Sequence, residues 1–531
     1  MQQAVLGIDI GTSACKALLL SADGVLIGSE TVAYGLVQLR PGWVEQDPAL
    51  WVNGAQTAVQ RLLAAHRSVQ VTAIGLTGQM HGLTPVDAAG QVLRPALLWN
   101  DQRNGEECAQ LVAQAGGAQA LHGHTGNGML PGYTGGKIAW MRRHEPALFS
   151  RLRHALNPKD YLRLVLTGEI ATEVSDASGT GLFDARRRVW STVLMEKLDI
   201  DPALFPSCHE SPEVTGRVSA RGAKLFSLTA GIPVVGGGGD SIIQTLGSGV
   251  LDPGEIQTII GTGGIVACSL DQPLDDPAHR LQVFCHVLPG KWHAMGVTLN
   301  AGFAMSWAQR LLRGFSDDDH WTYDEMAGIA AHSTAGSRGL IFLPYLNGER
   351  APYADPELRG GFIGLTSLHR PADIVRAVME GITYALYDIF TLMPQAGRKT
   401  HALKASGGGA RSPLWRQMQA SLFDCDVVTT QGAAEGAAFG AALVAGLGTG
   451  MYASVADIVR ICRPLTQDGV DPDMRSGMQK GFTVYRALYP ALREHLHALS
   501  QAFNEAPCHA PSARSDFPVQ GGPGDSGGST G

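Results

Sequence analysis

The chain has 531 residues, of which 44% are hydrophobic and 17% charged, and its net charge is −7. This length suggests more than one domain, and the composition excludes a disordered chain because it supplies enough apolar material for large buried cores. The acidic balance argues against nucleic acid as the main partner, since phosphate backbones bind to basic surfaces.

The cysteine spacing and the apolar segments predict where in the cell the protein is located. The eight cysteines have wide, irregular spacings and form no CxxC pair, which predicts reduced thiols in the cytoplasm and neither a disulfide framework nor a zinc site. The N-terminal sequence has no basic stretch followed by a long apolar one, so no signal peptide is expected. Residues 436–456 carry no charge, but their abundant glycine predicts a buried helix of small residues followed by a loop, and no membrane contact.

Two strand–turn–strand patterns stand about half the chain apart. The first has apolar runs over residues 5–10 and 14–20 around Gly11-Thr12-Ser13, with a third strand starting at Val25. The second has runs over 255–260 and 265–269 around residues 261–264, which read Gly-Thr-Gly-Gly. This repetition predicts two domains of one architecture that face each other.

Helices and strands alternate between and after these hairpins. We expect a helix over residues 51–65, a strand over 71–76 and a strand over 232–235. A long amphipathic helix is expected over 371–390, a strand over 402–406 and a helix from Pro413 onward. Such alternation is typical of an α/β fold whose ligand loops follow the strand ends. Residues 505–531 are rich in Gly, Ser and Pro, which predicts a disordered tail.

Four strand ends are rich in glycine: residues 11–13, 236–240, 261–264 and 407–409. Glycine lets the backbone approach a phosphate closely, so that exposed N–H groups bind the phosphate oxygens. The chain contains neither the G-x-x-x-x-G-K-[ST] pattern of a P-loop nor an early G-x-G-x-x-G, so it is predicted to bind phosphate by another architecture.

Two carboxylates adjoin these glycine-rich ends. Asp9 lies inside an apolar strand, where it either caps the Gly-Thr turn or helps to hold Mg²⁺, which takes one or two carboxylates together with phosphate oxygens and water. Asp240 follows four glycines, where it is either a helix N-cap or a functional carboxylate. A carboxylate in that place can accept the proton of a nucleophilic hydroxyl during phosphoryl transfer.

Several motifs together resemble the FGGY family of carbohydrate kinases. They occur in the family's order over roughly residues 4–490: residues 7–13, Gly-Gln-Met-His-Gly at 78–82, Leu-Trp-Asn-Asp-Gln-Arg at 98–103, Pro-Lys-Asp-Tyr-Leu-Arg at 158–163, residues 237–240, Phe-Leu-Pro-Tyr-Leu at 342–346, Gly-Glu-Arg at 348–350 and residues 407–412. Gln-Met-His-Gly and Trp-Asn-Asp-x-Arg are typical of the members that act on xylulose.

The resemblance implies two actin-like (ribonuclease H-like) α/β domains with a deep interdomain cleft. It implies ATP with Mg²⁺ as the donor and D-xylulose, phosphorylated at its 5-hydroxyl, as the acceptor. The sugar-side domain with the catalytic aspartate would cover residues 1–245, and the nucleotide-side domain would cover residues 246–490. A homodimer is common among the enzymes that the chain resembles.

Carried over by position, the resemblance gives roles to individual residues. Asp240 becomes the catalytic proton acceptor, and Asp9 becomes the acid on the side of the metal and phosphates. Asp240 would also contact the sugar, together with Met80, His81, Trp99 and Asp101. The nucleotide-contacting positions would be Thr12, Ser13, Gly261, Thr262, Gly263, Gly302, Gly408, Gly409 and Ser412.

Some of these side chains suit the sugar site on their own chemistry. His81 lies on a loop after a strand, where a neutral imidazole could hydrogen-bond a sugar hydroxyl; the alternative is a satisfied structural histidine. Trp99 could offer its ring face to sugar C–H groups or belong to the core. Ser241-Ile242-Ile243 are bulkier than the small residues expected after the catalytic aspartate, which bears on the identity of the sugar. Gly263 also replaces a serine, and residues 300–303 differ from the usual Ser/Ala-rich run.

Other functions remain open at this point. Within the family, the alternative is a kinase for another ketose or a polyol. Outside it, an actin- or chaperone-like ATPase would use the same nucleotide fold without a sugar-side loop, and a non-catalytic sugar-binding protein would not depend on Asp240.

Overall fold

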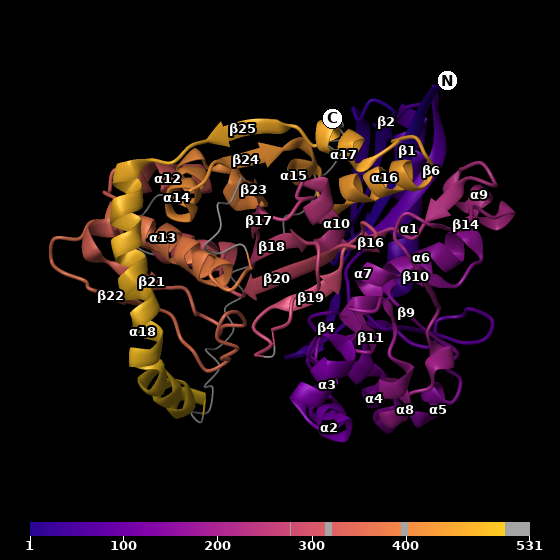
Figure 1. Cartoon of the computed structure of the whole chain (residues 1–531), viewed down its shortest axis with the longest axis horizontal. Helices are drawn as coiled ribbons and strands as arrows, with labels where there is room; N and C mark the ends of the chain where they lie inside the picture. The colour runs from indigo at the N-terminus through magenta and orange to yellow at the C-terminus, as the bar shows by residue number, and fades with distance from the viewer. Residues whose placement is uncertain (277, 314–320, 395–401, 505–531) are drawn as a thin grey trace, which may run out of the picture.

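The computed structural model describes residues 1–276, 278–313, 321–394 and 402–504. Two seven-stranded sheets lie in separate halves of the molecule (Figure 1). The predicted tail, residues 505–531, lies outside the described residues.

The first sheet is built around the N-terminal hairpin. Its strand order is β14-β15-β6-β1-β2-β3, and the short β16 also pairs with β6. The pairs β1–β2 and β2–β3 are antiparallel, whereas β1–β6 and β6–β15 are parallel. The strands are β1 (Gln2–Ile10), β2 (Ala14–Ser21), β3 (Leu26–Ala33), β6 (Val69–Gly78), β14 (Val214–Arg217), β15 (Pro233–Val235) and β16 (Gly238–Gly239).

The second sheet repeats this plan. Its order is β19-β20-β18-β17-β23-β24-β25. Again two antiparallel pairs, β17–β18 and β18–β20, lie on one side of β17, and two parallel strands, β23 and then β24, lie on its other side. The strands are β17 (Glu255–Ile260), β18 (Gly264–Leu270), β19 (Gln282–Cys285), β20 (Trp292–Thr298), β23 (Ala402–Ser406), β24 (Val427–Thr430) and β25 (Pro464–Asp468). The shared order confirms the predicted pair of α/β domains of one architecture.

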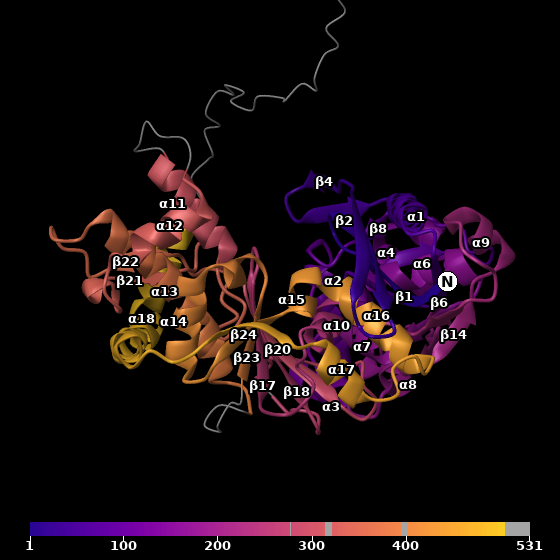
Figure 2. The ribbon, with the colours of Figure 1, turned by 90° about the horizontal axis from the view of Figure 1, so that it is seen from above.

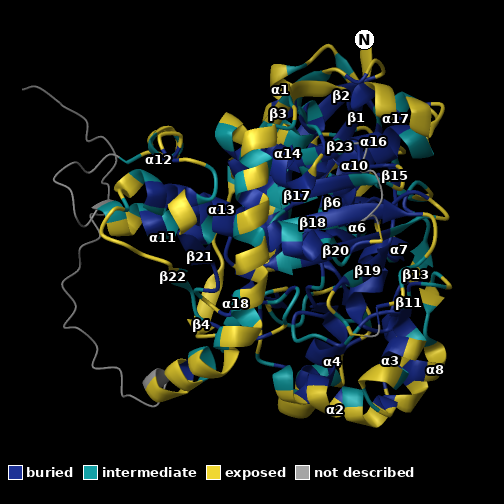
Figure 3. Cartoon of the chain, turned by 60° about the vertical axis from the view of Figure 1, so that its left-hand side comes forward, coloured by how far each residue is buried: buried dark blue, intermediate teal, exposed yellow. Residues whose placement is uncertain are grey.

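Helices cover the two sheets where the sequence predicts them. Helix α1 (Pro48–Ala65) begins after Asp47, whose carboxylate accepts from the Ala49 N–H, and it packs on β2 and β3. Helix α13 (Pro371–Phe390) packs on β18 and β20 and is buried along most of its length. The central strands of both sheets are buried, whereas the edge strands β3, β14 and β25 carry exposed residues and the long terminal α18 (Pro472–Asn504) exposes one side (Figure 3).

Helix α16 (Ala437–Gly448) returns from the second half of the sequence to the first sheet. It packs on β1 and β6, as both Figure 1 and Figure 2 show. A Cβ at Gly7 would overlap the carbonyl oxygen of Ala438, so only small residues permit this close approach. The structure thus confirms the predicted buried helix of small residues, and none of the helices it describes is long and apolar enough to cross a membrane.

The two halves are also joined through the edge strand β19. The side-chain amide of Asn127 donates to the carbonyl oxygen of Val283, and its oxygen accepts from the Val283 N–H at 2.9 Å. The Cys285 N–H donates to the Ser178 hydroxyl at 3.1 Å. These bonds satisfy backbone groups that an edge strand would otherwise leave open, and they fix β19 against the first half of the chain.

Smaller elements complete both halves. Those of the first half are β4 (Val37–Arg40), β5 (Trp43–Gln46), β7 (Thr84–Val86), β8 (Ala96–Leu97), α2 (Gly105–Ala115), α3 (Ala118–Thr125), α4 (Thr134–His144), α5 (Pro146–Phe149), β9 (His154–Leu156), α6 (Pro158–Thr167), β10 (Ala171–Glu173), α7 (Val174–Ala177), β11 (Phe183–Asp184), β12 (Val189–Trp190), α8 (Thr192–Lys197), β13 (Ser207–His209) and α9 (Ala220–Phe226). Helix α10 (Asp240–Gly247) follows β16 at the end of the first half, and the elements of the second half are α11 (Gly302–Arg313), α12 (Tyr323–Ala330), β21 (Ile341–Leu343), β22 (Gly361–Ile363), α14 (Pro413–Phe423), α15 (Gln431–Glu435) and α17 (Val455–Ile461).

Candidate active site

Strand register brings the two predicted carboxylates to one edge of the first sheet. On β1, Asp9 lies opposite Thr77 of the parallel strand β6. On β16, Gly238 pairs with the same Thr77, and Gly239 pairs with Gly78. Asp240 follows directly, so it leaves the sheet where Asp9 lies.

Asp240 is the first residue of α10, after an N-cap glycine. Its Oδ1 accepts from the Ser241 N–H at 2.7 Å and from the Ser241 hydroxyl at 3.3 Å. The preceding turn requires glycine, because Gly237 has a φ of 78° and a Cβ there would overlap the Leu76 carbonyl oxygen. The glycine run therefore lets the chain pass close over β6 before it presents the carboxylate.

Both carboxyl groups have raised pKa values. Burial, then the neighbouring Asp240 carboxylate, raise the pKa of Asp9 to about 7, against a smaller lowering by Lys16. Burial raises the pKa of Asp240 to about 6, and the two hydrogen bonds from Ser241 oppose that rise. Such perturbed acids are typical of functional sites, where a proton must be held or taken near neutral pH.

Lys16 is a site residue that the sequence reasoning missed. It lies opposite Asp9 in the β1–β2 hairpin, and its Nζ is 2.6 Å from a carboxylate oxygen of Glu435, the last residue of α15. The alternation of the hairpin could have revealed it, because paired residues on neighbouring strands place their side chains on one face.

His81 follows β6 on a strained loop. Its φ is 66°, and its ring stacks on Tyr133 with 4.6 Å between centroids. The ring Nδ1 lies 2.7 Å from the Gly179 carbonyl oxygen, so Nδ1 carries the proton and donates to it. Burial lowers the pKa of His81 to about 3, which leaves a neutral ring whose Nε2 can accept from a hydroxyl. The neighbouring Met80 is buried against Gly239 and Gly179.

The backbone of His81 is held by a buried lysine. Lys137 on α4 donates from Nζ to the carbonyl oxygens of His81, at 2.7 Å, and Gly132, at 2.6 Å. Burial lowers the pKa of Lys137 to about 7. Thr134 donates to the same His81 oxygen at 3.2 Å. The loop that carries the histidine is thus fixed by α4.

Trp99 and Asp101 differ in their surroundings. Trp99 is 42% exposed, which leaves part of its surface available to a ligand. Asp101 is fully buried, and its oxygens accept from Arg103 at 2.7–3.0 Å and from the Val44 N–H at 2.6 Å. These bonds engage both carboxylate oxygens, so Asp101 acts on the loop that carries Trp99. Direct contact of Asp101 with a sugar stays a prediction.

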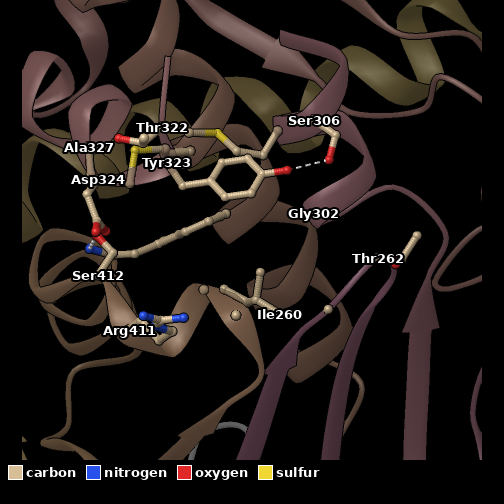
Figure 4. Close-up of a pocket in the computed structure, with 16 residues that line it drawn as sticks. Ile260, Thr262, Gly302, Ser306, Thr322, Tyr323, Asp324, Ala327, Arg411 and Ser412 are labelled. Atoms are coloured by element: carbon tan, nitrogen blue, oxygen red, sulfur yellow. Dashed lines mark hydrogen bonds between the residues drawn. The ribbon is translucent and has the colours of Figure 1, made fainter. Parts of the chain in front are cut away.

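A cavity of about 500 Å³ opens in the second half of the molecule (Figure 4). Six predicted nucleotide-contacting residues line it: Gly261, Thr262, Gly302, Gly408, Gly409 and Ser412. Gly302 begins α11 and donates to the Gly261 carbonyl oxygen at 2.8 Å; a Cβ there would overlap that oxygen. Ser412 caps α14 by accepting from the Trp415 N–H at 3.3 Å.

The remaining nucleotide-contacting predictions lie elsewhere. Thr12 and Ser13 belong to the first hairpin, in the other half of the molecule. The Gly263 carbonyl oxygen accepts from the Gly261 N–H at 3.0 Å, and Gly263 does not line the cavity. Their contacts with a nucleotide stay predictions.

The far wall of the cavity was not predicted. Ser306 on α11 and Tyr323 on α12 are joined by a 2.7 Å hydrogen bond between their hydroxyls (Figure 4). Asp324 and Arg411 lie near Ser412 around the same space. The capping box of Thr322 and Glu325, which starts α12, is the local signal that marks this wall.

Ile242 and Ile243 are core residues. Both are fully buried on α10 in the core shared with α16. Their bulk therefore fills that core.

The donor set near Asp9 fits a magnesium ion bound together with phosphates. Asp9 Oδ1 is buried and has no hydrogen-bond partner among the described residues. Those residues hold no group of three or more His, Cys, Asp or Glu side chains suited to a metal. Mg²⁺ does not need one, because it takes one or two carboxylates and otherwise phosphate oxygens and water.

Two models of known protein families match this chain. Residues 4–247 match the N-terminal domain of the FGGY family of carbohydrate kinases, and residues 257–449 match its C-terminal domain. The chain belongs to the FGGY family of carbohydrate kinases. It is therefore a sugar kinase, as the motifs predict.

Three relatives show how near the resemblance is. The xylulose kinase of Escherichia coli (strain K12) is 39% identical over 417 residues, which are 78% of this chain and 84% of that protein. The crystal structure of a xyloylose kinase from Brucella ovis has a TM-score of 0.85 at 36% identity and covers 93% of this chain and 100% of that one. That of a gluconate kinase from Lactobacillus acidophilus has a TM-score of 0.87 at 27% identity and covers 95% and 100%. The FGGY fold is thus shared by kinases of different sugars.

Proposed function

We propose that this FGGY kinase transfers the γ-phosphoryl group of ATP to the 5-hydroxyl of D-xylulose. The observation that carries the proposal is the convergence of Asp240, Asp9 and the His81 loop at one end of β6. Identity of 39% to a xylulose kinase supports D-xylulose as the acceptor.

Asp240 is proposed as the group that accepts the proton of the sugar hydroxyl. Its place at the start of α10 leaves Oδ2 without a hydrogen bond from the described residues, since the Ser241 bonds use Oδ1. Such a contact orients the hydroxyl and takes its proton late in a loose transition state, with a contribution of roughly 10²–10⁴-fold.

The sugar side is proposed to include His81, Met80 and Trp99. The neutral His81 ring offers Nε2 as an acceptor for a hydroxyl, because Nδ1 donates to Gly179. The exposed part of Trp99 suits the C–H face of a sugar. Neutral groups of this kind fit an uncharged acceptor.

The nucleotide is proposed to occupy the cavity of the second half, with its phosphates directed by Thr262, Gly408 and their neighbours. Asp9, with its unpartnered Oδ1, would help to hold Mg²⁺. When bound, the ion supplies neutralisation of the phosphate charge. Asp9 would be held ionised in that complex, because a nearby cation favours the charged carboxylate.

We also propose the domain boundaries, a location in the cytoplasm and a homodimeric state. The sugar side would occupy residues 1–245 and the nucleotide side residues 246–490. A cytoplasmic location suits the seven cysteines in the described part of the chain, none of which forms a disulfide. A homodimer is tested by sedimentation equilibrium of the purified chain.

A sugar panel tests the function. ADP release is measured with ATP and Mg²⁺ in the presence of D-xylulose, other ketoses, polyols and gluconate, and without sugar. We expect the highest kcat/KM with D-xylulose. A higher value with another sugar would reassign the acceptor, and equal ADP release without sugar would favour the ATPase alternative.

A further inference from the structure

A buried ion cluster lies behind the turn that presents Asp240. The Nζ of Lys159 is 2.7 Å from Asp160, 3.2 Å from Asp176 and 3.5 Å from Glu173. All four side chains are at most 1% exposed. The proposed phosphoryl transfer uses none of them directly.

One member of the cluster reaches the turn through a serine. Glu173 Oε1 accepts from the Ser175 hydroxyl at 2.9 Å, and the same hydroxyl oxygen accepts from the Gly239 N–H at 3.0 Å. Gly239 immediately precedes Asp240. The path from the ammonium of Lys159 to the backbone beside Asp240 is therefore continuous and fully buried.

The rest of the turn is anchored by bonds that do not pass through Ser175. Arg163 donates to the carbonyl oxygens of Val235, at 2.8 Å, and Gly236, at 2.6 Å. The Gly237 N–H donates to the backbone oxygen of Ser211 at 2.9 Å. Ser175 thus accepts the hydrogen bond from the backbone N–H of Gly239, the residue just before the carboxylate.

We propose that Ser175, held by the Lys159–Glu173 cluster, is a positioning residue for Asp240. This inference rests on the proposed role of Asp240 as proton acceptor. It also gives a function to the Pro-Lys-Asp-Tyr-Leu-Arg motif, whose Lys159 and Arg163 lie behind the turn rather than against a ligand.

Physical arguments favour positioning over stability as the purpose of the cluster. A buried ion pair contributes little net stability, because desolvation offsets its attraction, and such groups are best understood where they fix one arrangement. Proton transfer needs the carboxylate within hydrogen-bond reach of the hydroxyl. A misplacement of about 1 Å can cost about 10²-fold in rate.

Ser211 provides a matched control. Its hydroxyl donates to Glu173 Oε2 at 2.7 Å and is as fully buried as that of Ser175, but it makes no bond to residues 236–240. Its contact with Gly237 uses the backbone oxygen, which an alanine retains. Ser175→Ala and Ser211→Ala therefore each remove one hydrogen bond to the same carboxylate, and only the first leaves the Gly239 N–H without its partner.

The test measures kcat, both KM values and the melting temperature of the full chain. We expect Ser175→Ala to lower kcat about 10- to 100-fold with both KM values within about threefold. Ser211→Ala should keep kcat within about twofold while its melting temperature falls. Ser175→Cys keeps nearly the same size but offers a weaker acceptor, so its kcat should lie between those of Ser175→Ala and the parent.

Equal kcat in Ser175→Ala and Ser211→Ala would overturn the positioning role. If Ser175→Ala does not fold, a Ser175→Cys enzyme with the parent's kcat overturns it instead. Asp240→Asn is assayed in parallel: retained turnover there would remove the base role itself, whereas lost turnover with an unaffected Ser175→Ala would leave the base role and remove only the positioning.

Discussion

The indole Nε1 of Trp99 donates a 3.0 Å hydrogen bond to the hydroxyl of Thr12. Thr12 in turn donates to the side-chain oxygen of Gln79 at 3.3 Å, in the loop that continues to Met80 and His81. The first Gly-Thr hairpin and the sugar-side loops therefore form one hydrogen-bonded unit. A substitution in the sugar-side loops can therefore change the orientation of Thr12, which is predicted to contact the nucleotide.

Trp99→Phe tests this link. The substitution keeps an aromatic face but removes the N–H donor, so the orientation of Thr12 is released. We expect kcat/KM to fall about 3- to 10-fold with respect to both D-xylulose and ATP, since a neutral hydrogen bond contributes about 0.5–1.5 kcal/mol. Trp190→Phe is the control, because its Nε1 donates to the Pro206 carbonyl oxygen away from the site. A fall confined to the sugar would mean that Trp99 acts only as a sugar platform.

Asp240→Asn tests the proposed base. The amide keeps the size of the side chain and an oxygen for the Ser241 N–H, but it cannot accept the hydroxyl proton. Turnover should fall about 10²–10⁴-fold. Nucleotide affinity, measured by titration calorimetry with ADP, should stay within about threefold of the parent, because the cavity lies in the other half of the molecule. Turnover near that of the parent would exclude the role.

The pH dependence follows from the two carboxyl groups. Asp240 must be ionised to accept a proton, and burial raises its pKa to about 6, while Asp9 rises to about 7. Activity is therefore lost as pH falls through this range and is recovered above it. The acid limb of kcat/KM should therefore lie between about pH 6 and pH 7. If the acid limb of kcat/KM were centred below pH 5, neither carboxyl group would control the activity of the free enzyme.

Local patterns in the sequence predicted the hairpins, the alternating α/β elements and the glycine-rich strand ends, because each is encoded by neighbouring residues. They also marked Asp9, since a carboxylate in an apolar strand is unusual. The sequence did not predict Tyr323 and Arg411 as site residues, because only tertiary packing brings α12 and the turn after β23 around one cavity. Lys137 was not predicted for a related reason. A lysine on a helix is ordinarily solvated, and no pattern of neighbouring residues indicates that this one reaches back to His81.

Lys137→Met tests whether α4 fixes the sugar-side loop. The substitution keeps the apolar stem and removes both hydrogen bonds to backbone carbonyls, so the positive φ of His81 loses its restraint. We expect the KM for D-xylulose to rise about tenfold and the KM for ATP to change less than twofold, since one or two buried bonds are worth about 1–3 kcal/mol. Lys197→Met serves as the control, because Lys197 donates to the Ala115 carbonyl oxygen at 2.6 Å far along the chain from this loop. An equal rise in both KM values would indicate a general loss of structure.

His293 predicts a loss of stability in acid that is separate from catalysis. The ring is fully buried, neither nitrogen has a hydrogen-bond partner among the described residues, and burial lowers its pKa to about 3. The unfolded chain, with an ordinary histidine pKa near 6.5, then binds a proton before the folded chain does. Stability therefore falls as pH drops below about 6.5, by up to ~1.4 kcal/mol per pH unit from this group. His293→Phe removes the group, so chemical denaturation should show a smaller loss of unfolding free energy between pH 7 and pH 5 than in the parent, by about 2 kcal/mol. The same slope in both proteins would mean that other groups, such as the neighbouring buried His286, dominate the acid response.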